Sequence, residues 1–218
     1  MERACPRAGW RRWVWLLILG AAAPGCRTLI TTAAYVIRGT NTPAEYTGLN
    51  DKKVAVVCRP LQELQYSSAG ACRDLAANVA ELLRRHARRV KVVDPAKVDR
   101  WVDENGMEDF VEVGRALDAD LVLAIDLESF NWLQGQTVYQ GKADVLLSVH
   151  DVRDDTVLWQ KHMKQVVYPS AGTSAQDYGS EDQFRREFIG VLAYEIARHF
   201  YPHDGTLDFA RDSRTLDH

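Results

Sequence analysis

The chain contains 218 residues, of which 46% are hydrophobic and 26% are charged, and its formal net charge is −3. These values are typical of one ordinary globular domain with additional segments, and they exclude a fibrous or wholly disordered protein. With 27 basic and 30 acidic residues the chain has no overall basic field, which argues against a nucleic-acid partner.

The first 25 residues have the pattern of an export signal. Four arginines precede an uncharged apolar stretch at residues 13–23. That stretch has the length of a signal-peptide core and is shorter than the roughly 20 residues that a membrane-spanning helix needs. Two alternatives stay open. In the first, an ordinary signal peptide is removed and Cys26 stays unmodified. In the second, the signal remains as an uncleaved anchor that apolar residues at 29–37 extend.

Residues 23–26, Ala-Pro-Gly-Cys, follow the apolar stretch directly. They resemble the lipobox of bacterial lipoproteins, in which the signal is cleaved before a cysteine that carries a diacylglycerol. The resemblance implies cleavage between Gly25 and Cys26 and lipidation of Cys26. Lipoboxes usually have Leu three residues before the cysteine and Ala or Ser two residues before it, where this chain has Ala23 and Pro24.

Cleavage at this position would leave an acidic protein held at a membrane. Without residues 1–25 the chain has 193 residues, 23 basic and 29 acidic, and a net charge of −6. Arg27 follows the cysteine, where an Asp would resemble the inner-membrane retention signal, so the outer membrane, facing the periplasm, is favoured. Residues 26–51 contain Gly, Asn and Pro breaks and are expected to form a membrane-proximal tether. Packing of residues 28–37 against the domain is the alternative.

The first half of the domain alternates apolar runs with helical patterns. Runs at residues 54–57, 90–93 and 121–125 predict buried strands, and apolar stripes at three- and four-residue spacing predict helices between them. The order β-α-β-α-α-β predicts parallel strands that are linked by right-handed crossovers.

The second half changes period. Residues 139–149 alternate between apolar and polar side chains, which predicts a half-exposed strand, and residues 157–168 predict its hairpin partner. A loop is expected at residues 169–179, followed by a helix that begins at Ser180 with a capping box to Gln183.

Residues 52–201 are therefore expected to form an α/β domain. Its sheet should be mixed, with about five strands in the order β-α-β-α-α-β-β-β-α, arranged in two or three layers. Residues 202–218 are expected to form a polar tail.

Four segments resemble one group of bacterial envelope domains. They are residues 53–57 before a long helix, residues 92–94 before a helix, a G-x-x-L-x-A-D pattern at residues 114–120 before a strand, and the hairpin at residues 149–159. Together they resemble the αβ domain of the TolB amino-terminal region, the curli secretion lipoprotein CsgG and the LpoB-type activators of penicillin-binding proteins. The resemblance implies that fold and a role in recognising other envelope proteins. A CsgG-like pore is not expected, because it needs additional amphipathic hairpins.

Cys58 and Cys72 are the cysteines that remain once Cys5 is removed and Cys26 is lipidated. Their spacing fits neither a C-x-x-C redox motif nor a paired zinc motif. Two states stay open: one disulfide, which an exported protein can form, or two buried thiols.

The strongest local charge cluster lies at the end of the first long helix. Its members are Arg84, Arg85, Arg88, Arg89 and Lys91. They are interpreted either as solvated cations that complement the negative end of the helix dipole, or as a contact for anionic lipid or an envelope polymer.

The main hypothesis is a lipid-anchored envelope protein that binds other proteins in envelope assembly, secretion or cell-wall maintenance. No nucleotide-binding, metalloprotease or hydrolase motif occurs, so we expect no enzyme activity, no metal and no cofactor. The expected partners are the membrane, through the lipid, and another envelope protein or a second copy of the chain. The alternative is an envelope ligand-binding domain or enzyme with a pocket at the carboxyl ends of the strands, formed by Arg59, Asp126 and Glu128.

Overall fold

The structure, a computed structural model, describes residues 41–60, 65–134, 138–174 and 180–204. The chain divides into one unit of residues 1–41 and a second of residues 42–218. The predicted signal peptide, the lipidation site and most of the predicted tether and tail lie outside the described residues.

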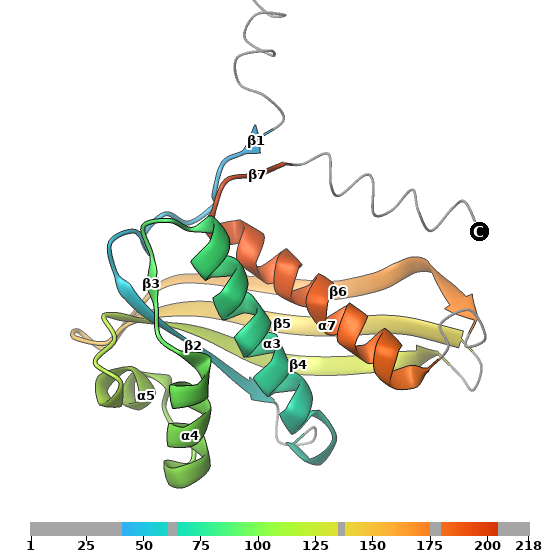
Figure 1. The fold of residues 1–218 in the computed structure, drawn as a ribbon, viewed down its shortest axis with the longest axis horizontal. Helices are drawn as coiled ribbons and strands as arrows, with labels where there is room; N and C mark the ends of the chain where they lie inside the picture. The colour runs from blue at the N-terminus through green and yellow to red at the C-terminus, as the bar shows by residue number, and fades with distance from the viewer. Residues whose placement is uncertain (1–40, 61–64, 135–137, 175–179, 205–218) are drawn as a thin grey trace, which may run out of the picture. The chain divides into compact units, whose positions relative to one another are not determined.

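The elements follow the predicted order, with a short strand added before the domain and another after it (Figure 1). In chain order they are β1 (Asn41–Thr42), β2 (Lys53–Pro60), α3 (Gln65–His86), β3 (Lys91–Val92), α4 (Pro95–Asn105), α5 (Phe110–Ala116), β4 (Leu121–Gln134), β5 (Val138–Asp151), β6 (Thr156–Ser174), α7 (Glu181–Ala197), the 3₁₀ turn η2 (Arg198–Phe200) and β7 (His203–Asp204).

The main sheet has five strands in the order β3-β2-β4-β5-β6. β2 pairs in parallel with β3 and β4, whereas β4, β5 and β6 pair in an antiparallel meander. The prediction of a mixed sheet with parallel strands in the first half is confirmed. β1 and β7 form a separate two-stranded sheet.

Helices cover both faces of the sheet, so the fold has three layers, one of the two predicted arrangements (Figure 1). α3 and α7 bury one face, where Phe184, Phe188 and Leu192 of α7 are fully enclosed. α4 and α5 pack on the other face, against Ala55 of β2 and Val122 of β4. Within the described residues no helix is both long enough and apolar enough to cross a membrane.

The predicted helix starts are confirmed at atomic level. The Asp94 carboxylate accepts a hydrogen bond from the Ala96 amide at 3.1 Å, and Pro95 occupies the first turn of α4. At the start of α7 the Ser180 hydroxyl accepts from the Gln183 amide at 3.2 Å. Each side chain satisfies an amide that has no partner within the helix.

The G-x-x-L-x-A-D pattern is explained by packing and by a turn. A Cβ on Gly114 would lie 2.5 Å from methyl groups of Val122 and Val152, so no side chain fits there. Asp118 has a φ of 53°, and the Asp120 carboxylate accepts from the Lys53 amide at 2.8 Å, which joins the start of β2 to the turn before β4. The pattern is therefore structural.

The antiparallel strands are longer than the sequence predicts. β4 continues to Gln134, beyond the expected end at Ile125, and β6 continues to Ser174, into the segment that was expected to be a loop. Register shifts after Leu127 break the simple alternation of apolar residues, which is why the pattern stops early.

Asp144 forms hydrogen bonds that stabilise the strands where the register between β4 and β5 shifts. Its carboxylate accepts from the Gln165 amide and from the Ser129 hydroxyl, both at 2.7 Å. The bond from the Gln165 amide, followed by that from Ser129, lowers the pKa of Asp144. A polar residue in this position supports an extended strand that hydrophobic periodicity does not detect.

The structure also differs from the sequence prediction at the end of the tether. Residues 45–51, which the sequence assigns to the tether, pack on the domain. The amides of Glu45 and Tyr46 donate to the His199 carbonyl at 2.9 and 3.0 Å, and Leu49 is 1% exposed. A single apolar residue in a polar stretch shows no hydrophobic periodicity, so the sequence contains no signal for this contact.

Candidate functional site

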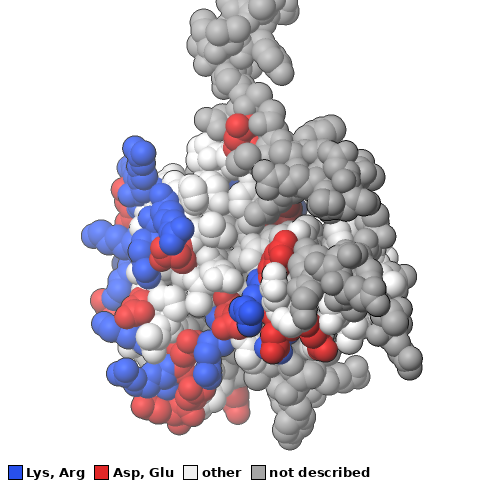
Figure 2. All heavy atoms as spheres, turned by 45° about the vertical axis from the view of Figure 1, so that its right-hand side comes forward, with Lys and Arg blue, Asp and Glu red and all other residues white. Residues whose placement is uncertain are grey.

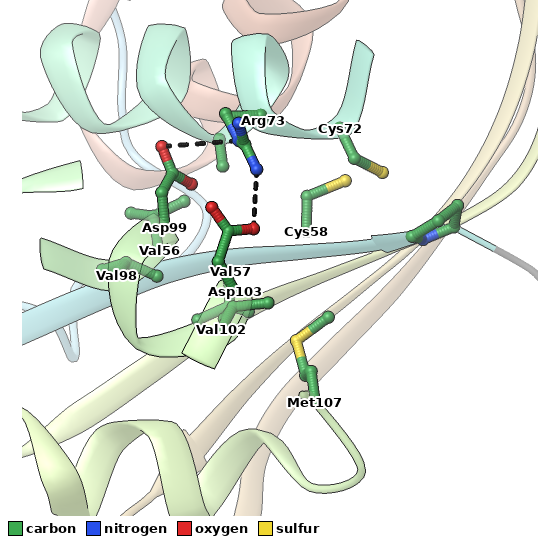
Figure 3. A pocket seen from close by; sticks show the side chains of 12 residues that line it. Val56, Val57, Cys58, Cys72, Arg73, Val98, Asp99, Val102, Asp103 and Met107 are labelled. Carbon is green, nitrogen blue, oxygen red and sulfur yellow. Dashed lines mark hydrogen bonds and ion pairs between the residues drawn. The ribbon is translucent and has the colours of Figure 1, made fainter. Parts of the chain in front are cut away.

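A cavity of about 170 Å³ lies at the carboxyl end of β2, between α3 and α4 (Figure 3). Its wall is apolar where Val56, Val98 and Met107 contribute, and its rim carries the charged side chains of α3 and α4. This is where open αβ sheets commonly bind ligands. Its volume is below the ~300–1,000 Å³ that is usual for small-molecule sites.

Cys58 of β2 and Cys72 of α3 lie side by side in the wall of this cavity (Figure 3). Both are free thiols in the structure; Cys72 is buried, and Cys58 is half-buried with its sulfur directed toward Cys72. Burial, followed by the neighbouring Cys72 thiol, raises the pKa of Cys58 well above its ordinary value. A thiol that stays protonated is a poor nucleophile and a poor metal ligand.

Arg73 connects the two helices across the rim. It forms ion pairs with Asp103 at 2.8 Å and with Asp99 at 3.9 Å, both from α4 (Figure 3). Burial raises the pKa of Asp99, against the effect of Arg73, which lowers it. The rim therefore carries one guanidinium against two carboxylates. Sequence reasoning missed this cluster because its members come from separate helices with no common motif.

The three residues predicted to form the pocket do not line this cavity. Arg59 and Asp126 lie together on the face of the sheet that α4 and α5 cover, with Arg59 Nε donating to Asp126 Oδ1 at 2.8 Å. The guanidinium also lies 4.3 Å from the ring centre of Phe110 in α5. Side chains alternate along a strand, so Cys58 faces α3 and Arg59 faces α5.

Glu128, two residues after Asp126 on β4, has a different partner. It bonds to His162 of β6, with 2.6 Å between Oε2 and Nε2. None of the three residues lines the cavity at the carboxyl end of β2, and a pocket that they share stays a prediction.

A serine and histidine pair lies on the same face as Arg59. Ser148 Oγ is 2.8 Å from His150 Nε2, and Ser148 is 5% exposed. Burial lowers the pKa of His150. Neither residue lines a described cavity, so the bond is best explained as satisfaction of a buried hydroxyl. The sequence did contain a signal for this pair, because residues two apart on one strand lie on the same face of the sheet.

His199 of η2 forms a second polar cluster, with Glu45 and Lys161. Its Nδ1 lies 2.9 Å from Glu45 Oε2, and Lys161 forms an ion pair with the same carboxylate. His199 Nε2 is buried and has no partner among the described residues. Burial, followed by the charge of Lys161, lowers the pKa of His199 to about 4. The histidine is therefore neutral at neutral pH.

A groove of about 490 Å³ runs between the edge strand β6 and α7 beside this cluster. Met163, Val166 and Tyr168 line it from β6, and Val191 lines it from α7. The large apolar side chains that remain exposed among the described residues are all on β6: Val157 (53%), Leu158 (47%) and Val167 (38%). Within the described residues β6 is thus an edge strand of the main sheet that carries exposed apolar side chains.

Comparison with known proteins identifies no family. The sequence matches no protein-family model and no curated protein. Solved structures with some likeness include the PelC dodecamer from Paraburkholderia phytofirmans, which is 15% identical with a TM-score of 0.43, over 74% of this chain and 96% of that one. Lipoprotein GNA1162 from Neisseria meningitidis is 14% identical with a TM-score of 0.41, over 66% of this chain and 97% of that one. A minor lipoprotein from Acinetobacter baumannii is 13% identical with a TM-score of 0.34, over 70% and 92%.

Proposed function

We propose that this chain is a lipid-anchored envelope protein whose αβ domain binds another protein in envelope assembly, secretion or cell-wall maintenance. The amino-terminal pattern that ends at Cys26 supports the anchor. The resemblance of residues 52–201 to TolB-type, CsgG-type and LpoB-type domains supports this class of role, because those proteins recognise other envelope proteins.

The observation that carries the binding role is the exposure of apolar side chains on β6, an edge strand of the main sheet. A free sheet edge offers unpaired backbone amides and carbonyls, to which a partner strand can add. On β6 this edge coincides with the exposed apolar side chains Val157, Leu158 and Val167, and with the groove along α7. Apolar side chains beside an open edge are a common feature of protein-binding surfaces.

The polar clusters support a role without catalysis. The raised pKa of Cys58 disfavours its thiolate. Arg59 and Asp126 neutralise each other, and Arg73 balances one of its two aspartate partners. A nucleophile with an adjacent base and an accessible hollow is the arrangement that covalent catalysis needs. Ser148 and His150 supply a hydroxyl with an adjacent base, but neither of them lines a described cavity.

The anchor is tested by metabolic labelling with palmitate in a bacterial host. We expect the full chain to incorporate label and Cys26→Ala to lose it; equal labelling of the two would contradict the anchor. Cys5→Ala is the control, because the proposed cleavage removes that residue. Separation of the inner and outer membranes on a density gradient tests the proposed outer-membrane location.

The binding role is tested with a photo-crosslinking amino acid placed at Leu158 of the full chain in its native host. We expect one defined adduct that mass spectrometry identifies, and a lower yield of the same adduct in Val157→Asp. Crosslinker at Ala96, an exposed residue of α4, is the matched control. Identical adducts from both positions would rule out a specific edge. An adduct with a second copy of the chain would identify the partner as the protein itself.

The alternative function is binding of a small ligand at the carboxyl end of β2. The cavity between α3 and α4 favours it, because it lies where the sheet topology predicts a site. Because its volume is small, the cavity supports ligand binding less than the surface of β6 supports protein binding.

A further inference from the structure

The basic cluster at the end of α3 lies at the same end of the domain as the start of the folded chain. The cluster comprises Arg84, Arg85, Arg88, Arg89 and Lys91. The Asp51 amide donates to the Arg89 carbonyl at 2.7 Å, and the Asp51 carboxylate pairs with the Arg89 guanidinium. Residues 45–51 therefore lead from the end of α7 directly to the end of α3 (Figure 1).

A ring contact fixes the relation between these two helix ends. The rings of His86, the last residue of α3, and Tyr201, which follows η2, stack with their centres 4.9 Å apart. The Glu45 amide bonds to the His199 carbonyl in the same turn. A tether that arrives at Thr42 consequently reaches the domain at the end that carries the basic cluster.

The carboxylates around the cluster neutralise only part of its charge. Glu81 pairs with both Arg84 and Arg85, and Asp51 pairs with Arg89. Arg88 and Lys91 are exposed and form no ion pair with any other described residue. Figure 2 shows Lys and Arg side chains gathered along the left side of the molecule, with blue dominant in its upper part. Cations that only complement a helix dipole need no such excess.

The rest of the protein has the opposite charge. The chain after residue 25 has a net charge of −6, so the cluster is a local basic surface on an acidic protein. At physiological ionic strength the screening length is about 8 Å. The basic cluster therefore attracts an anionic surface, and carboxylates elsewhere on the protein are too distant to repel that surface. Such a surface would orient the domain with the end of α3 toward it.

From these observations we propose that the basic cluster at the end of α3 contacts the anionic phospholipid headgroups of the membrane in which Cys26 is anchored. The inference rests on the proposed anchor. Residues 26–42 reach at most about 55 Å at ~3.5 Å per residue, so the anchored domain stays close to the bilayer. A weak electrostatic contact then suffices, because the tether holds the cluster at a high local concentration near the headgroups.

The test compares two lysines of one protein. The full lipidated chain is inserted in nanodiscs of phosphatidylcholine alone, or of phosphatidylcholine mixed with phosphatidylglycerol, and is treated with a water-soluble acetylating ester. Lys91 lies in the cluster, whereas Lys97 is an exposed residue of α4, the helix at the lower end of the view in Figure 1. We expect severalfold slower acetylation of Lys91 in the anionic discs only, with the Lys97 rate unchanged.

A matched pair of variants identifies the charge as the cause. One Lys or Arg near an anionic surface changes binding by about fivefold, so Arg88→Gln should reduce the protection of Lys91 by about that factor. Arg100→Gln on α4 removes the same charge at a distant exposed position and should leave the protection intact. Salt at about 1 M, which shortens the screening length to ~3 Å, should abolish the protection.

Two outcomes would overturn the inference, and they are distinguishable. If the protein stays in both kinds of disc and Lys91 reacts at the same rate in both, the basic cluster does not contact lipid, although the anchor is intact. If the protein is retained by neither kind of disc, the anchor itself is wrong, and the proposed contact fails with it.

Discussion

His199 Nδ1 lies 2.9 Å from Glu45 Oε2, which connects the end of the last helix to the segment that precedes β2. The neutral ring donates from Nδ1, and its unprotonated Nε2 is buried without a described partner. Protonation would place a second N–H in that buried position, so the charged ring is disfavoured.

Acid should therefore destabilise the protein through His199. Its folded pKa is about 4 against an ordinary value of 6.5, so between these pH values the unfolded chain binds more protons than the folded one. This contribution to stability is present above pH 6.5 and is lost as the pH falls toward 4. At about 1.4 kcal/mol per pH unit the loss has an upper limit of about 3 kcal/mol. Melting temperature measured against pH should decline less steeply in His199→Gln; parallel curves would contradict the assignment.

Replacement of Gly141 by alanine should destabilise the core. The added Cβ would lie 2.4 Å from the ring of Phe188, which is 0% exposed and stacks on Phe130 with the ring centres 5.3 Å apart. Overpacking of this kind costs about 1–3 kcal/mol. The control is Gly190→Ala in α7, where no atom lies within 4 Å of the new Cβ, and a gain of up to ~1 kcal/mol is expected from helix propensity. Equal urea midpoints for the two variants would refute this account.

The thiols of Cys58 and Cys72 should react slowly in the folded protein. Cys72 is 3% exposed, and the pKa of Cys58 is well above its ordinary value, so little thiolate forms at pH 8. We expect alkylation by iodoacetamide at least about tenfold slower than in urea-unfolded protein, since each pKa unit reduces the thiolate fraction about tenfold. The tryptic peptide of residues 54–73 contains both cysteines, and its mass reports zero, one or two modifications or a disulfide. Rapid native alkylation would show that the thiols are accessible.

Arg59 and Asp126 should be energetically coupled. They lie on neighbouring positions of β2 and β4, and Asp126 has a side-chain exposure of 18% against 39% for Arg59. Because Arg59 is partly solvated, we expect a coupling of only about 1 kcal/mol from a double-mutant cycle of Arg59→Met and Asp126→Asn. Additive unfolding free energies would show that the pair makes no net contribution.

The elements of the domain were predictable because they depend on local chemistry. The apolar runs at residues 54–57 and 121–125, and the caps Asp94 and Ser180, each act within a few residues, and the structure has them as predicted. The ends of β4 and β6 were not predictable, because a strand continues wherever its neighbour offers backbone partners. Asp144, bonded to Ser129 and Gln165, keeps those partners in place across a register shift.

The candidate sites depended still more on the tertiary structure. The sequence by itself determined the residue types and contains the pattern that predicts an export signal ending before Cys26, since such a signal is a linear segment. Only the fold decided that Cys58 faces Cys72 while its neighbour Arg59 faces Phe110 on the other side of the sheet. Only the fold joined Glu45 to His199, and Asp51 to the end of α3. Contacts between residues far apart in the chain depend on which faces of helices and strands are buried together, and no local pattern encodes that choice.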